Sequence, residues 1–141
     1  MGVVGPSSAV DAAVDWYGVA DITAQSQHSA CRAAGADLPP ELLVPPEDQL
    51  VGGQDEAARA AASPVSYVTP EAPPFLLIHG AADAVVPYRQ SELLEAALSR
   101  AGVPVRLVPV KGADHIFEGH DDIDAVVHMS VDYLAVALGR A

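Results

Sequence analysis

The stretch FLLIHG, residues 75–80, constrains the fold of this chain more than any other. Phe75 to Ile78 form a continuous apolar run, which follows Pro73 and Pro74 and ends before a His-Gly pair. A strand with one face in water alternates apolar and polar residues, whereas a strand covered on both faces is apolar throughout. The run therefore predicts a strand buried inside a parallel sheet.

Strands and helices alternate on both sides of this run. Apolar strands are expected at Ala13 to Tyr17 and at Val103 to Val110. Residues 88–102 place leucine and alanine at helical spacing before a glycine, and a last helix is expected from about Asp121 to Leu138. Such alternation implies parallel strands joined by right-handed crossovers. The predicted fold class is α/β, with about three parallel strands and flanking helices.

Residues 19–62 interrupt this alternation. The segment contains paired prolines at 39–40 and 45–46 and paired glycines at 52–53. Only one short helix is expected in it, at Gln54 to Ala62. A segment so long and irregular is typical of a lid or a binding insert. We therefore expect one domain over residues 1–141, with a lid-like insert at 19–62.

Composition excludes several classes of partner. The formal net charge is -12, with only 7 lysines and arginines, so the clustered cations that bind nucleic acid or anionic membrane are missing. No apolar run approaches the roughly 18 residues of a membrane span, and the first residues do not resemble a signal peptide. The single cysteine, Cys31, cannot form an internal disulfide. We expect a cytoplasmic protein with no nucleic-acid or membrane partner.

Two short motifs carry the chemistry. HGAADAVVP places Asp83 just after the buried strand, and GADHIFEG places His115 just after the next strand. Because the carboxyl ends of parallel strands meet at one edge of a sheet, the two motifs should lie side by side. A serine hydrolase needs a histidine to take the serine proton and a carboxylate to fix the histidine tautomer. In α/β-hydrolases the acid precedes the histidine along the chain. Asp83 and His115 are therefore the candidate acid and base.

The two motifs together resemble a known family. Residues 62–119, with HGxxDxxVP followed by GxxH, are similar to the C-terminal half of bacterial α/β-hydrolases of the carboxylesterase and lipase type. This group includes feruloyl-esterase-, hormone-sensitive-lipase- and prolyl-oligopeptidase-like enzymes. AVDWYGVADI, residues 13–22, resembles their strand after the nucleophile helix. The resemblance implies the C-terminal portion of one α/β-hydrolase domain, with Asp83 and His115 in the catalytic triad and no metal or organic cofactor.

One part of the family pattern is missing from the sequence, the G-x-S-x-G elbow that presents the nucleophile. GPSSA, residues 5–9, matches it only in part, at Ser7. No buried strand precedes Ser7, the next strand follows within a few residues, and Pro6 removes an amide. An oxyanion-hole loop of the HGGG type is missing as well. We expect the 141 residues alone to lack triad-dependent turnover.

The expected function is that of a serine-type acyl hydrolase, with a small-molecule ester as the substrate of the complete enzyme. Two alternatives stay open: a prolyl-oligopeptidase-like serine peptidase fragment, and a degenerate hydrolase half that acts as a non-enzymatic binding or oligomerisation module. The strand at residues 13–17 would leave an apolar edge open, where an N-terminal half or a second copy could pair.

Other residues are weighed against simpler interpretations. Residues that follow strands on the expected site face could line a substrate pocket or pack in the core; they are Trp16, Tyr17, Ile116 and Phe117. His79, at the end of the buried strand, is expected to be structural. The acids at positions 121, 122 and 124 suit the N-terminus of a helix better than a cation site. No metal site is expected.

Overall fold

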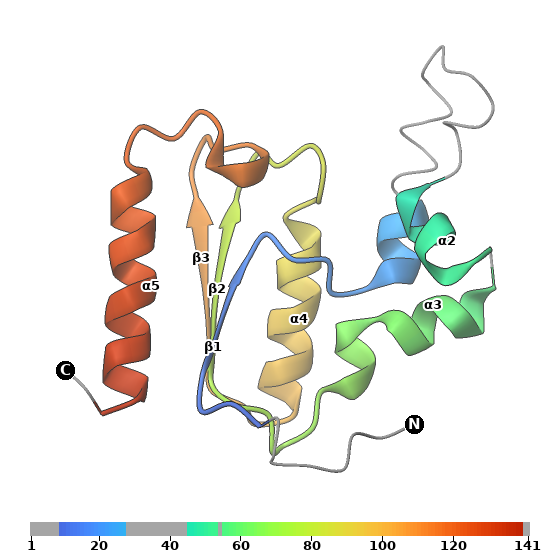
Figure 1. The fold of residues 1–141 in the computed structure, drawn as a ribbon, viewed down its shortest axis with the longest axis horizontal. Helices are drawn as coiled ribbons and strands as arrows, with labels where there is room; N and C mark the ends of the chain where they lie inside the picture. Colours follow the sequence, from blue (N-terminus) through green and yellow to red (C-terminus); the bar gives the residue numbers. More distant parts are fainter. Residues whose placement is uncertain (1–8, 28–44, 54, 140–141) are drawn as a thin grey trace.

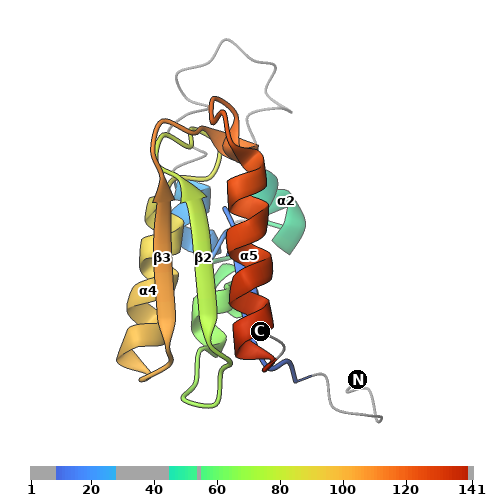
Figure 2. The same cartoon turned by 90° about the vertical axis from the view of Figure 1, so that its left-hand side faces the viewer.

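The computed structural model describes residues 9–27, 45–53 and 55–139. Strands β1 (Ala13–Trp16), β2 (Phe75–Gly80) and β3 (Val105–Val110) form one parallel sheet in the order β1-β2-β3. Helix α4 (Arg89–Arg100) covers one face of the sheet and helix α5 (Ile123–Ala137) covers the other (Figure 1). In the view turned by 90°, α5 runs lengthwise along the sheet (Figure 2). The predicted α/β class with three parallel strands and flanking helices is confirmed.

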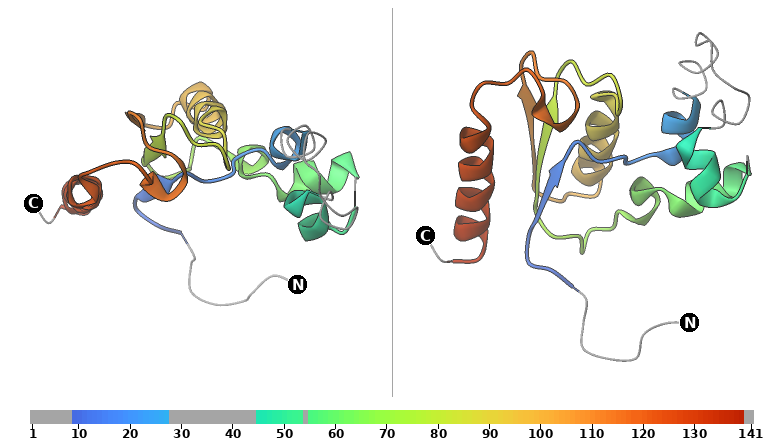
Figure 3. Two further views of the ribbon diagram at one scale, coloured as in Figure 1. Left: turned by 90° about the horizontal axis from the view of Figure 1, so that it is seen from above. Right: turned by 45° about the horizontal axis from the view of Figure 1, so that its top comes forward.

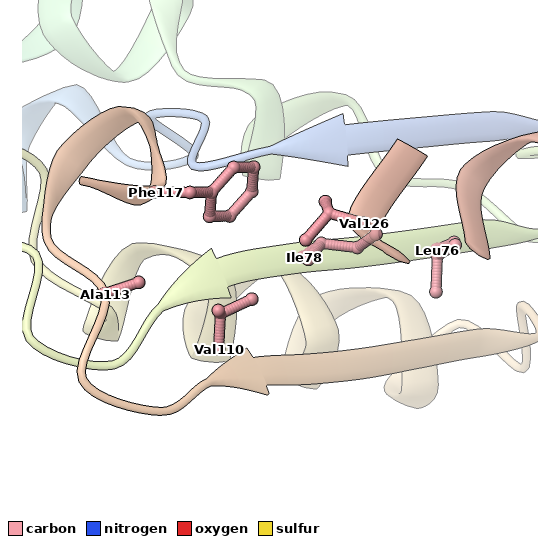
Figure 4. Packing of buried hydrophobic residues seen from close by; sticks show 6 residues of the cluster. All are labelled: Leu76, Ile78, Val110, Ala113, Phe117 and Val126. Atoms are coloured by element: carbon pink, nitrogen blue, oxygen red, sulfur yellow. The ribbon is translucent and has the colours of Figure 1, made fainter. Parts of the chain in front are cut away.

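The central strand β2 is buried on both faces, as its apolar run predicts. Successive side chains of a strand point to opposite faces. Leu76 and Ile78 pack on the α5 side, in a cluster with Val126 (Figure 4). Leu77 packs on the α4 side, in a second cluster with Leu98. Each face of the sheet therefore has its own hydrophobic core, and β2 belongs to both.

The strand β3 begins two residues later than predicted. The backbone N–H of Val103 donates to the Leu98 carbonyl at 3.0 Å, which ties Val103 to the end of α4. Pairing with β2 starts beside Pro104, whose carbonyl accepts the Phe75 N–H at 2.9 Å. Helix α5 begins after Asp122, whose carboxylate accepts the Ala125 N–H at 2.9 Å. The first of these contacts is local: it closes the end of α4 beside Gly102, whose φ is 76°, and so keeps Val103 out of the strand.

The expectation of a single short helix within residues 19–62 is wrong. Helix α3 (Glu56–Ala62) matches the expected one, while Gln54 lies outside the described residues. Residues 22–27 and α2 (Pro46–Val51) are also helical. Pro46 takes the first position of α2, where no N–H donor is needed, and acids follow it in the first turn. The described part of the insert is thus helical, whereas its lid role stays a prediction.

The described part of the insert is held together by polar contacts. It lies beside α4, on the side away from α5 (Figure 3). The buried carboxylate of Asp48 accepts from the Ser26 hydroxyl at 2.7 Å and pairs with the guanidinium of Arg59. A short 3-10 helix, η2 (Pro64–Tyr67), then leads toward β2. None of the helices within the described residues has the length and apolar character needed to cross a bilayer.

Gln90 connects α4 to the chain after β1. Its side-chain carbonyl accepts the N–H groups of Ala20 and Asp21 at 3.0 and 2.8 Å, and its amide donates to the Asp21 carbonyl at 3.1 Å. Gln90 is itself 2% exposed. The contact satisfies several backbone groups that the turn after β1 cannot pair by itself.

The substitution Gln90→Ala is expected to lower the free energy of unfolding by about 2 kcal/mol, because it leaves backbone donors without partners in a buried site. Urea unfolding followed by circular dichroism measures the change. Ser99→Ala, on the exposed side of the same helix, is the matched control and should change little. Equal midpoints for the two variants would contradict the assignment of this contact.

Candidate active site

Asp83 lies in the acid loop, defined as residues 81–87, which leaves the carboxyl end of β2. Its Oδ1 accepts the backbone N–H groups of Val85 and Val86 at 2.9 and 2.8 Å. An aspartate that accepts from amides two and three residues ahead is a common way to fix a turn. The Asp83 side chain has 0% of its surface exposed. The acid loop therefore fixes Oδ1 in place, and this sets the direction in which the second carboxylate oxygen, Oδ2, points.

His115 lies in the base loop, defined as residues 111–119, which leaves the carboxyl end of β3. Both loops rise from the same end of the sheet (Figure 1). The Nδ1 atom of His115 lies 2.9 Å from Oδ2 of Asp83. Because an ionised carboxylate only accepts, Nδ1 carries the hydrogen and Nε2 keeps its lone pair. The His115 side chain is 29% exposed, so a buried acid orients a base that solvent reaches. The structure thus brings together the two residues that the sequence singled out.

The two loops also meet at their backbones. The Ala82 N–H donates to the Ala113 carbonyl at 3.0 Å, and the Ala81 N–H donates to the Val110 carbonyl at 2.9 Å. A Cβ atom on Gly80 would lie 2.6 Å from the carbonyl oxygens of both Ala113 and Asp114. A glycine at the end of β2 therefore permits the close approach of the base loop.

Backbone strain is concentrated around His115. Ile116 and Phe117 have φ angles of 55° and 61°, and Tyr17 has a φ of 47°. Positive φ is uncommon for residues other than glycine and is unfavourable for β-branched side chains such as isoleucine. Such residues cost on the order of 1–3 kcal/mol each and gather at functional sites. The strain here is consistent with a loop shaped for the placement of His115.

The four candidate pocket residues occupy different environments. Phe117 is 2% exposed and packs in the core against Trp16, at a ring-centroid distance of 5.5 Å. The indole of Trp16 donates to the Ser130 hydroxyl at 3.0 Å. Tyr17 lies edge to face with His115, at a centroid distance of 4.9 Å, and Ile116 is 63% exposed. Tyr17 and Ile116 are thus the two that adjoin the base at the surface.

His79 has a contact that sequence reasoning missed. Its Nε2 lies 2.9 Å from the Val86 carbonyl and 3.2 Å from Oδ2 of Asp83, and its Nδ1 lies 2.7 Å from the Ser91 hydroxyl. Since both partners of Nε2 are acceptors, Nε2 carries a hydrogen. His79 is fully buried. Oδ2 of Asp83 therefore lies between two histidines. No periodic signal in the sequence indicated this contact, because residues 79–83 form a strand end and a turn and not a helix.

Asp15 on β1 is a second acid close to the strand ends. Burial raises the pKa of its carboxyl, and the Gly18 N–H and the nearby His79 partly offset this effect. A raised pKa in the folded state means that Asp15 contributes stability at low pH, which is lost as the pH rises through that pKa. The ionised Asp15 carboxylate therefore lowers the stability of the fold at neutral pH.

Two residues weighed in the sequence, Ser7 and Cys31, lie outside the described residues. Within residues 9–27, 45–53 and 55–139, no three His, Cys, Asp or Glu side chains are grouped as a metal ion would require. The chemistry available in the described residues thus centres on one oriented imidazole and its carboxylate.

Parallel strands with helices on both faces, and an acid and a histidine on loops after consecutive strands, are features of the α/β-hydrolases. The BD-FAE family model matches residues 4–98 of this chain, which include Asp83. The chain belongs to this family, and several of its relatives are esterases. The likeness to bacterial α/β-hydrolase esterases that the two motifs suggested is thereby confirmed.

Individual relatives agree with this assignment. The esterase LipQ of Mycobacterium tuberculosis is 34% identical over 145 aligned residues, an alignment that covers 94% of this chain and 31% of LipQ. Among solved structures, a truncated carbohydrate esterase from gut microbiota has a TM-score of 0.65 at 26% identity, and covers 97% of this chain and 47% of its own. A butyrate-bound esterase from Thermogutta terrifontis has a TM-score of 0.61 at 25% identity, with coverages of 92% and 44%. The chain thus spans about a third of the length of LipQ.

Proposed function

We propose that this chain supplies the acid and the base of a serine-type hydrolase of carboxylic esters. Asp83 is the acid and His115 is the base, and the serine belongs to a polypeptide segment outside the 141 residues. The observation that carries the proposal is the 2.9 Å contact between His115 Nδ1 and Asp83 Oδ2, with the other carboxylate oxygen held by backbone N–H groups. Membership of an esterase family supports the same reaction.

The proposed mechanism follows from this orientation. The serine Oγ attacks the ester carbonyl while Nε2 of His115 takes its proton. The tetrahedral intermediate collapses when the imidazolium returns that proton to the leaving alkoxide, which leaves an acyl-enzyme. Water then attacks the acyl group while Nε2 of His115 takes its proton. The imidazolium returns that proton to the serine Oγ, which leaves as the carboxylic acid is released. Asp83 stays ionised throughout and stabilises the imidazolium, an interaction strengthened by burial of the carboxylate.

We place the ester beside the surface residues next to the base. Ile116 follows His115 directly and exposes most of its side chain, and Tyr17 contacts the imidazole ring. Both present apolar surface that an acyl or alcohol group could cover. Trp16 and Phe117 support this surface from the core beneath it.

A fluorophosphonate probe, which reacts with activated serines, tests the proposal. The 141-residue chain is expected to take up no probe and to leave p-nitrophenyl butyrate unhydrolysed, because its sequence contains no G-x-S-x-G elbow. Labelling of Ser7 in that chain would overturn this expectation.

Sequencing the DNA upstream of the Met1 codon shows which of the two candidates to test next. A reading frame that continues into a strand, an elbow and a helix predicts a longer protein that reacts at its elbow serine, and in which His115→Ala abolishes labelling. Equal labelling of folded wild type and His115→Ala would contradict the role of the base.

A p-nitroanilide substrate separates ester from peptide-like hydrolysis. An in-frame stop codon would instead favour the non-enzymatic candidate.

That second candidate rests on the outer edge of β1. The Ala13 and Tyr17 N–H groups donate to the carbonyls of Pro74, just before β2, and Ile78, in β2, at 3.0 and 3.1 Å. The backbone groups of Val14 and Trp16 therefore point the other way. No strand among the described residues pairs with that side. The other edge strand, β3, carries Pro109, a residue typical of natural sheet edges. We propose that the β1 edge pairs with an N-terminal half or a second copy. Sedimentation of the chain as a monomer would exclude the second copy.

A further inference from the structure

We propose that Asp114 is a positioning residue, which holds the base loop against the acid loop so that His115 meets Asp83. The inference rests on the proposed function, since the Asp83–His115 contact matters for proton transfer. In the sequence, Asp114 is the residue directly before the candidate base in the GADH motif. In the structure, the Asp114 carboxylate connects the base loop to the acid loop.

The connection is made by one carboxylate oxygen. Oδ1 of Asp114 accepts the backbone N–H of His115 at 2.7 Å and the backbone N–H of Ala84 at 2.7 Å. Ala84 directly follows Asp83 in the chain. The oxygen therefore joins the residue after the acid to the base itself, across 30 positions of sequence. Hydrogen bonds from N–H groups to an ionised carboxylate are shorter and stronger than neutral ones.

The base loop needs such an anchor because of its own conformation. Its residues Ile116 and Phe117 are both left-handed, which is unfavourable for non-glycine residues. The loop is closed on itself by the Asp114 N–H, which donates to the Glu118 carbonyl at 2.8 Å. This internal bond fixes the shape of the loop but leaves its distance from Asp83 undetermined. The Asp114 carboxylate supplies the second constraint, since its acceptor Oδ1 binds a donor on the acid loop.

The backbone bond from Ala82 to Ala113 also joins the loops, but it lies where they leave the sheet. His115 is two residues beyond Ala113, so its ring could still turn away from Asp83. The Asp114 bridge acts next to the pair itself. Loss of the bridge is therefore expected to separate the pair while the sheet stays intact.

The tautomer of His115 reports on this contact without any catalytic activity. Long-range 1H–15N NMR of the 141-residue chain, at a pH where imidazoles are neutral, distinguishes hydrogen on Nδ1 from hydrogen on Nε2. The wild-type chain is expected to carry it on Nδ1. Asp114→Ala is expected to lose the Nδ1–H form as the major species, and to speed hydrogen exchange of the Ala84 amide by about tenfold. Asp114→Asn should behave as wild type, because its side-chain carbonyl still accepts both N–H groups.

Asp122→Ala is the matched control. It too removes an aspartate that accepts a backbone N–H, but at the start of α5, and it should leave the His115 tautomer unchanged. A folded Asp114→Ala variant that keeps His115 in the Nδ1–H form would overturn the proposal, as would an equal change in Asp122→Ala. If Asp114→Ala fails to fold, Asp114→Ser takes its place, because the serine hydroxyl is too short to reach both N–H groups. A folded Asp114→Ser chain with wild-type His115 and Ala84 signals would then overturn the proposal. None of these readouts depends on the serine, so a failure of the esterase proposal would appear separately, as absent fluorophosphonate labelling of the longer protein that contains the elbow serine.

Discussion

The Gly80→Ala variant is expected to lose about 3 kcal/mol of folding free energy, the upper end of the roughly 1–3 kcal/mol that overpacking typically costs. The added Cβ would lie 2.6 Å from the carbonyl oxygens of Ala113 and Asp114. These are backbone atoms, so no side chain can rotate away. Gly80 itself pairs with Val110 at the end of the central strand, and cannot shift without breaking the sheet register.

Urea unfolding compares this variant with Ala81→Ser, a change at the exposed neighbouring position. The control should unfold close to the wild-type midpoint, while Gly80→Ala should unfold at a much lower urea concentration. Any folded Gly80→Ala population should show the base loop displaced, with His115 no longer in its Nδ1–H form. Coincident midpoints for the two variants would mean that the loops can separate at little cost.

The sheet could be predicted from the sequence because its information is local. An apolar run in Phe75 to Ile78 identifies a strand covered on both faces, and the helical spacing of leucines identifies α4. The meeting of Asp83 and His115 followed from topology alone, because parallel strands end at one edge. Periodicity and chain order were thus sufficient for the architecture and for the central pair.

Helix α2 of the insert was missed because a proline can either break a helix or begin one. The prolines at 45–46 indicate a break when they fall inside a helix, but a helix start when the second takes the first helical position, as Pro46 does. Only the residues around a proline decide between the two. The acids at 47 and 48, which suit a first turn, were the signal that could have been used.

The finer parts of the site could not be predicted because they depend on distances between loops. The Asp114 carboxylate binds Ala84 only when both loops are already in place. The left-handed conformations of Ile116 and Phe117 contradict the preferences of these residues, so local propensity points away from them. The burial of Phe117 and the exposure of Ile116 follow from that unusual backbone.

The Asp83→Asn variant is expected to reverse the tautomer of His115. The backbone N–H groups of Val85 and Val86 need an acceptor, so the asparagine carbonyl must take the place of Oδ1. The amide NH2 then takes the place of Oδ2, 2.9 Å from Nδ1 of His115. Because the amide donates, Nδ1 must accept, and the imidazole hydrogen moves to Nε2. The Nε2 atom can then no longer take a proton from serine.

NMR of the isolated chain shows this reversal directly, as a loss of the Nδ1–H form of His115. In a complete enzyme with its serine, kcat should fall by about 10⁴-fold, the loss expected when the triad histidine is held in the wrong tautomer. Asp122→Asn is the control, because asparagine caps a helix nearly as well as aspartate and the site is remote. A folded Asp83→Asn chain in which His115 keeps its hydrogen on Nδ1 would show that another group orients the base.

Since His79 also directs an N–H at the position of Oδ2, the amide would in addition face a second donor. The variant should therefore also be less stable than wild type, which Asp122→Asn should not be.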